Sequence, residues 1–177
     1  MTQAPIYQPG NTSISGSDCP ASTIIVGLGN PILGDDGIGW RVAEEVQRQI
    51  ASKPEIIKDV EVECLSLGGL SLMEHLIGYQ RAILIDAVSL NRGPQGTIYP
   101  LKLEEFPDYA AGHLTSSHDT SLQTALRLGL SMGAQLPQEI IIIGIESSSV
   151  YDFSEELSPP VAEALPLAVK TVLRLIT

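Results

Sequence analysis

The sequence predicts a three-layer α/β sandwich, in which a twisted, largely parallel five-stranded sheet carries helices on both faces. Apolar runs of strand length alternate with segments of helical periodicity, which is typical of parallel sheets joined by right-handed crossovers. The run RAILIDAV, residues 81–88, is continuously apolar up to its aspartate, as expected for a strand covered on both sides. A chain of 177 residues that is 44% hydrophobic is large enough for one well-buried core.

The first half of the chain begins with residues 1–22, which are rich in Ser, Thr, Gly, Pro and Gln. We expect them to form a flexible extension, because they offer little apolar surface to offset the loss of chain entropy. Residues 23–177 then form a single domain. Short β-branched or apolar runs predict strands, and apolar residues about four apart, with charges between them, predict amphipathic helices. The elements expected here are a strand at 23–28, a helix at 37–51, a strand at 60–67 and a helix at 70–79.

The second half of the chain repeats this alternation. After the central strand at 81–88, the elements expected are a strand at 96–101, a helix at about 119–132, a strand at 139–145 and a closing helix at 159–176. The spacing of apolar residues predicts which side of each helix faces the sheet. For the helix at 119–132, the residues expected on that side are Leu122, Ala125, Leu126 and Leu130.

The charge and the cysteines exclude several classes of protein. Ten basic residues against 21 acidic ones give a net charge of −11, and no Lys or Arg cluster could attract nucleic acid. No basic, apolar leader and no apolar stretch of spanning length is present, so we expect no secretion signal and no membrane anchor. Cys19 and Cys64 have neither metal-site nor disulfide spacing, which favours the reducing cytoplasm.

Polar residues gather where the predicted strands end. Asn30, Asp35 and Asp36 follow the first strand, Gly68 and Gly69 follow the second, and Asp86 lies near the end of the third. His118 precedes the helix after the long loop and can reach the same edge. Because ligands bind beyond the carboxyl ends of parallel strands, we predict the functional site there.

Structural explanations compete with each of these assignments. One of Asp35 and Asp36 is expected to cap the following helix, since carboxylates bind free N–H groups there. Asp86 could equally form a salt bridge with an arginine, and spacing alone favours a surface or capping role for His118. The remaining candidates, which we interpret as structural or solvent-facing, are His75, His113 and the strand residue Cys64.

Several familiar motifs are absent. A dinucleotide fingerprint would need a third glycine where Ile32 stands, and neither G-x-S-x-G nor H-E-x-x-H occurs. What remains is a pair of carboxylates and one imidazole. Such a set suits a borderline divalent ion, such as nickel or zinc, with coordination positions left open.

The motifs GLGNPILGDDGIG, LGGLSLMEHL, ILIDAV, SSHDTSL and IIIIGIE, in this order, resemble those of the hydrogenase maturation endopeptidases. These enzymes remove the C-terminal extension of the [NiFe] hydrogenase large subunit and have a phosphorylase/hydrolase-like fold. By motif position, the resemblance implies that Asp36, Asp86 and His118 contact the metal and act in catalysis. It also implies that Gly68 and Gly69, to which we add Asn30, bind the substrate.

The same resemblance implies that nickel is not a resident cofactor but arrives in the precursor, although another divalent ion could occupy the site in isolation. The expected protein is a nickel-dependent, aspartic-type or metal-assisted endopeptidase that is a monomer or a weak oligomer. Its partner is the large-subunit precursor. Leu67 and Leu70 flank the glycine pair where many members have Asp and a small polar residue.

Two other functions remain as alternatives. IIVGLGNP also resembles the start of bacterial peptidyl-tRNA hydrolases, but those esterases continue with a Thr-Arg-His-Asn segment, and LGDD stands here instead. The acidic chain also argues against a tRNA partner. The second alternative is a non-catalytic, nickel-sensing assembly factor, which would use the same site geometry without cutting.

Overall fold

The computed structural model describes residues 22–52, 59–105, 121–148 and 153–177. Within them, one five-stranded sheet has the order β2-β1-β3-β5-β4. Four strands run parallel and β4 pairs antiparallel with β5 at one edge, so the predicted fold class is confirmed. The strands are β1 (Thr23–Leu28), β2 (Val60–Leu65), β3 (Arg81–Val88), β4 (Ile98–Lys102) and β5 (Glu139–Glu146).

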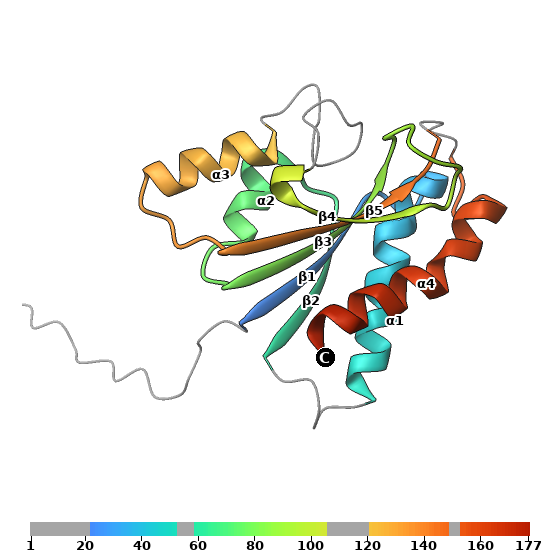
Figure 1. Cartoon of the computed structure of the whole chain (residues 1–177), viewed down its shortest axis with the longest axis horizontal. Helices are drawn as coiled ribbons and strands as arrows, with labels where there is room; N and C mark the ends of the chain where they lie inside the picture. Colours follow the sequence, from blue (N-terminus) through green and yellow to red (C-terminus); the bar gives the residue numbers. More distant parts are fainter. Residues whose placement is uncertain (1–21, 53–58, 106–120, 149–152) are drawn as a thin grey trace, which may run out of the picture.

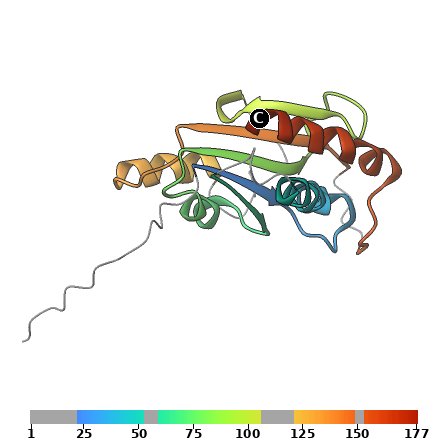
Figure 2. The ribbon, with the colours of Figure 1, turned by 90° about the horizontal axis from the view of Figure 1, so that it is seen from below.

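Helices cover both faces of the sheet, which gives the three predicted layers (Figures 1 and 2). The elements are the short 3-10 helices η1 (Gly34–Gly37) and η2 (Leu103–Glu105), and the α-helices α1 (Ile38–Ala51), α2 (Gly69–His75), α3 (Leu122–Ser131) and α4 (Pro159–Ile176). Helices α1 and α4 pack together on one face, and α2 and α3 on the other. None of the described helices is long and apolar enough to cross a bilayer.

The alternation of side chains along β3 divides the apolar interior into two cores. Leu84 faces α2 and α3, whereas Ile83 and Ile85 face α1 and α4, and all three are fully buried. Since successive side chains of a strand point to opposite faces, a strand in the middle of the sheet must be apolar at nearly every position. This explains the continuous apolar runs of the central strands.

Helix α3 differs from the prediction in its start and in one buried position. It begins at Leu122 with Ser121 as N-cap, whose hydroxyl accepts a hydrogen bond from Thr124 N–H, rather than at about residue 119. Leu130, predicted to face the sheet, is 61% exposed. Gly129 occupies the inward position instead, where an added Cβ would lie 2.8 Å from Met73 Sδ.

Three further element boundaries differ from the predicted ones by a few residues. β2 ends at Leu65 and α2 ends at His75, both earlier than predicted, while β4 begins at Ile98. Gly96, expected to start β4, has φ +83° and forms the turn before the strand. A left-handed residue cannot continue an extended strand, which explains the later start.

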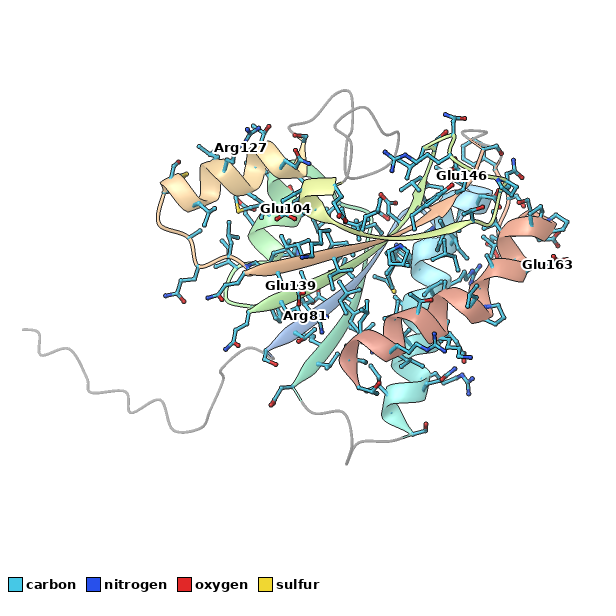
Figure 3. The ribbon with its side chains drawn as sticks, viewed as in Figure 1. Arg81, Glu104, Arg127, Glu139, Glu146 and Glu163 are labelled. Carbon is cyan, nitrogen blue, oxygen red and sulfur yellow. The ribbon has the colours of Figure 1, made fainter. Side chains whose placement is uncertain are left out.

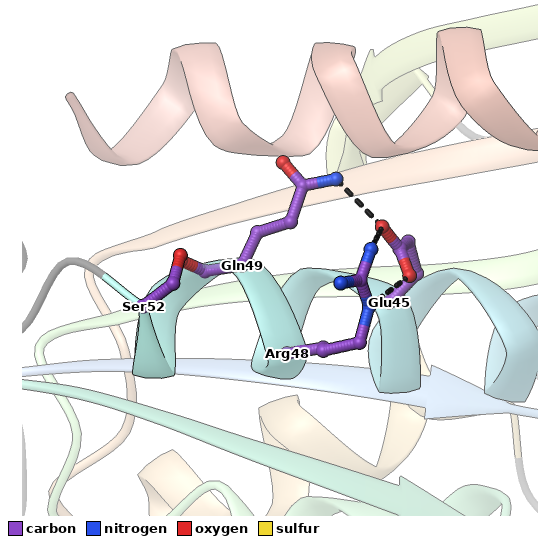
Figure 4. Close-up of polar contacts among 4 residues, drawn as sticks. All are labelled: Glu45, Arg48, Gln49 and Ser52. Carbon is purple, nitrogen blue, oxygen red and sulfur yellow. Dashed lines mark hydrogen bonds and ion pairs between the residues drawn. The ribbon is translucent and has the colours of Figure 1, made fainter.

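The solvent-facing side of α1 carries a local network of polar side chains (Figure 4). Arg48 donates two hydrogen bonds to the Glu45 carboxylate, at 2.8 and 2.6 Å, and Gln49 donates a third at 2.7 Å. These contacts, that of Arg48 first, lower the pKa of Glu45 to about 2. Glu45 therefore stays charged at physiological pH. We interpret this network as a feature of the helix surface and not as part of a functional site.

The two ends of the sheet differ in character. At the amino end of the parallel strands, Arg81 on β3 pairs with Glu139 on β5, with 2.6 Å between Nε and Oε2. At the opposite end lies the buried Glu146, as Figure 3 shows. This carboxyl end is also where the predicted site residues follow their strands.

Candidate active site

A tight turn after β1 shapes the candidate site. Gly29 has φ +122°, and an added Cβ would collide with the main-chain oxygen of Asp36. Only glycine therefore allows η1 to fold back onto the end of β1. The glycine-rich turn serves to bring a carboxylate close to the sheet, and no phosphate is needed to explain it.

Asp36 is held by the first residue of this turn. Its Oδ2 accepts a hydrogen bond from Asn30 N–H at 2.7 Å, and the Asn30 side-chain oxygen accepts one from Ile32 N–H at 3.2 Å. Asn30, predicted to bind substrate, thus has a positioning contact with the neighbouring predicted site residue. The loop is closed by these two bonds, which fixes the Asp36 carboxylate relative to β1.

Asp35 has a different role from that predicted. The N-cap of α1 is Gly37, which has no side-chain capping bond, so Asp35 is not the residue of the pair that caps this helix. Asp35, which is 8% exposed, instead accepts hydrogen bonds from the backbone N–H of Ser158 at 2.6 Å and from its hydroxyl at 2.8 Å. It therefore joins the first loop to the start of α4, a contact between residues far apart in sequence.

Asp86 lies near the end of β3 and is fully buried. It alternates with Leu84 and Val88, so it belongs to the sheet face covered by α2 and α3. β3 also contacts η1, which carries Asp36. The structure thus brings Asp36 and Asp86 to the same edge of the sheet, as predicted.

The glycine pair joins this edge from the side of β2. Gly68, in extended conformation, precedes α2, and Gly69 has φ +51°. The Ser66 hydroxyl just before them donates a hydrogen bond to the Gly29 main-chain oxygen at 2.7 Å. The turns after β1 and β2 are therefore in contact, consistent with one shared site.

His113, interpreted as structural or solvent-facing, and His118, predicted to contact the metal, both lie outside the described residues. His75 is at the exposed end of α2, with its Nδ1 3.6 Å from a Glu63 carboxylate oxygen, in keeping with its structural interpretation. Among the described residues, no group of three or more His, Cys, Asp or Glu could hold a metal. The predicted contact of His118 with the metal thus stays a prediction.

Cys64 fits its interpretation as a structural residue. It is half-buried in β2, and its thiol donates to the main-chain oxygen of Trp40 at 3.8 Å. Burial, and secondly the charge of Glu44, raise the pKa of the Cys64 thiol to about 11. A thiol that stays protonated at neutral pH is a poor nucleophile.

Glu146 is a buried carboxylate that the sequence analysis missed. It is 3% exposed at the end of β5, on the same face of the sheet as Asp86, and its Oε1 accepts a hydrogen bond from Asn91 N–H at 3.0 Å. Burial raises the pKa of the neighbouring Tyr99, and the Glu146 carboxylate adds to this effect. The signal was present in the sequence, because IIIIGIE ends in an acid as ILID does.

The fold and the site together define an α/β protein in which several carboxylates lie near the C-terminal ends of the strands of a mainly parallel sheet. The chain belongs to the hydrogenase maturation protease family, whose model matches residues 40–175. The resemblance found in the sequence motifs is thereby confirmed.

Individual relatives agree with this assignment. The chain is 28% identical over 158 residues to the hydrogenase expression/formation protein HupD of Rhizobium leguminosarum bv. viciae, covering 89% of this chain and 75% of HupD. It is also similar to HoxM of Cupriavidus necator, at 28% over 150 residues, covering 83% of this chain and 70% of HoxM.

Solved structures share the fold. The [NiFe] hydrogenase maturation protease HybD of Thermococcus kodakarensis superimposes with a TM-score of 0.62 at 25% identity, covering 88% of this chain and 99% of HybD. The hydrogenase maturating endopeptidase HybD of E. coli gives a TM-score of 0.64 at 22% identity, with 86% and 90% covered.

Proposed function

We propose that this protein is an endopeptidase that removes the C-terminal extension of a [NiFe] hydrogenase large-subunit precursor once nickel has been inserted. The observation that carries the proposal is the match of residues 40–175 to the hydrogenase maturation protease family. The placement of Asp36 and Asp86 at one edge of the sheet supports it.

In this proposal the nickel belongs to the substrate, and the protein recognises it. Asp36, Asp86 and His118 contact the ion, since carboxylate and imidazole groups suit a borderline divalent metal. Asp36 is fixed by the Asn30 main chain and Asp86 by its place within a central strand. Such preorganised groups can position a metal-bearing peptide without first having to be ordered.

The reaction is the hydrolysis of one peptide bond. The oxygen of a water molecule bonds to the scissile carbonyl carbon, the C–N bond breaks, and the proton from water goes to the departing amine. Nickel held near the carbonyl would assist by polarising it or by activating the water. Gly68 and Gly69 are expected to let the peptide backbone approach closely beside the metal.

The test is cleavage of nickel-loaded precursor by Asp36→Asn, Asp86→Asn and His118→Ala variants, followed by intact-mass spectrometry. We expect each variant to lose about 100-fold or more in rate, as when a transition-state contact is removed. Glu163→Gln, on the outer side of α4, is the matched control and should cleave normally. Undiminished cleavage by Asp86→Asn would contradict the assigned site.

The mass of the precursor after incubation also distinguishes a protease from an assembly factor that only holds the precursor. The protease shortens the precursor, whereas an assembly factor leaves its mass unchanged. Nickel-free precursor provides the metal control and should stay uncut. Equal cleavage with and without nickel would contradict recognition of the ion.

A further inference from the structure

Two large apolar side chains lie exposed beside the candidate site. Ile32, in the loop between β1 and η1, is 48% exposed, and Phe153, which precedes α4, is 88% exposed. An aromatic ring so fully in solvent gains nothing for the stability of the fold. Its position next to a carboxylate site therefore calls for another explanation.

The two residues are held side by side by main-chain contacts. Leu33 and Ser154 form a parallel bridge, in which Gly34 N–H donates to Ser154 O at 2.6 Å and Ser154 N–H donates to Ile32 O at 3.1 Å. Ile32 and Phe153 each precede one member of the bridged pair. The two side chains therefore leave adjacent stretches of main chain beside the candidate site.

This apolar pair, Ile32 and Phe153, is tied to the Asp36 carboxylate. Ile32 N–H donates to the Asn30 side chain, and Asn30 N–H donates to Asp36. These two hydrogen bonds connect Ile32, through Asn30, to Asp36, which is proposed to act on the substrate. A polypeptide bound with its cleavable bond near Asp36 would therefore extend across or beside the pair.

The surroundings of the pair are acidic. A cavity of about 390 Å³ lies next to the bridge, and Asp35, Glu156 and Ser158 are among its lining residues. Glu155 and Glu156 are exposed directly after the bridge, and Arg41, which donates to Glu155 O at 3.4 Å, offsets only part of this charge. The surface therefore favours a cationic occupant over an anionic one.

We infer that Ile32 and Phe153 form a docking surface for the precursor segment next to the cleaved bond, and that this segment carries an apolar side chain close to Lys or Arg. The inference rests on the proposed function. A second copy of this chain fits less well, because a symmetric contact would bring the glutamates of both copies together. An anionic membrane surface would be repelled for the same reason.

The test uses the full-length protein and nickel-loaded precursor, with Phe153→Ser and Ile32→Ser as variants. Losing the burial of a large apolar side chain should raise both Kd and KM about tenfold, while kcat stays within about twofold. The matched control is Met132→Ser, at the C-cap of α3, where Met132 is 77% exposed on another part of the molecule. It should bind as the wild type does.

A double Glu155→Gln and Glu156→Gln variant examines the charge. Its affinity should fall and depend less on salt than that of the wild type, because screening acts on the removed charges. Unchanged Kd values for Phe153→Ser and Ile32→Ser, or an equal loss for Met132→Ser, would overturn the docking surface.

The outcomes also separate this inference from the proposed function. A wild-type protein that cuts, with variants that bind and cut equally well, refutes the docking surface alone. A wild-type protein that binds through the apolar pair without cutting refutes only the endopeptidase. Absence of any binding by the wild type refutes both.

Discussion

Single residues decide the shape of the candidate site. Gly29 permits the close approach of Asp36, and Asn30 then fixes the Asp36 carboxylate with a 2.7 Å hydrogen bond. A residue with a Cβ in place of Gly29 would displace η1 and with it the carboxylate. The spacing of the motif GLGNPILGDD is thus explained by contacts between its own members.

At the same scale, Cys64 is expected to be unreactive in the folded protein. Its thiol pKa is raised to about 11, mainly by burial, so its thiolate fraction at pH 8 should be about 100-fold below that of an ordinary cysteine. In a Cys19→Ser background, Cys64 is the only thiol, and its labelling by a thiol-disulfide reagent can be timed directly. Native labelling should be slow and labelling in urea fast. Similar rates in both states would show that the thiol is accessible and ionised.

At the scale of elements, the packing of α1 against the sheet depends on one glycine. An added Cβ at Gly39 would overlap the main-chain oxygens of Leu28 and Ile85, so the helix lies directly on β1 and β3. The sequence shows the helical periodicity of this segment but not how close it comes to the strands. That distance is set by the facing residues of three elements.

Gly39→Ala is therefore expected to destabilise the fold. The clash should cost about 1–3 kcal/mol, which outweighs a gain of up to about 1 kcal/mol in helix propensity. Urea unfolding measures the difference. The comparison variant is Gly133→Ala, where nothing lies within 4 Å and only the positive φ of +84° opposes the change. Only Gly39→Ala should also impair precursor cleavage, because it shifts η1. A variant as stable as the wild type would argue against this packing.

At the scale of the whole molecule, Asp35 connects the two ends of the domain. Both its oxygens bind Ser158, 123 positions later in the chain, and the bridge between Leu33 and Ser154 lies beside this contact. The closing helix and the first loop therefore hold each other in place. The apolar pair and the Asp36 loop depend on this arrangement.

Asp35→Ala should lower the free energy of unfolding by about 2 kcal/mol, because it leaves the partly buried N–H and hydroxyl of Ser158 without their charged acceptor. Ser158→Ala removes only the hydroxyl contact and should cost less. Chemical denaturation of both variants gives the comparison. Equal unfolding midpoints for Asp35→Ala and the wild type would mean that this connection contributes nothing to stability.

The sequence by itself determined the layered α/β fold, since the apolar runs of the central strands and the periodicity of α1 and α4 depend only on local spacing. It also placed Asp36 and Asp86 at one edge, because parallel strands all end there. Boundaries set by long-range packing were less predictable, as the exposed Leu130 and the inward Gly129 show.

Only the tertiary structure decided that Asp35 binds the start of α4 instead of capping α1, and that the loop of Ile32 lies against the segment that carries Phe153. It also identified Glu146 as a buried carboxylate on the same sheet face as Asp86. These contacts join segments distant in the chain. Residue spacing encodes local geometry, whereas the partner of a side chain across the molecule is fixed only once the elements have packed.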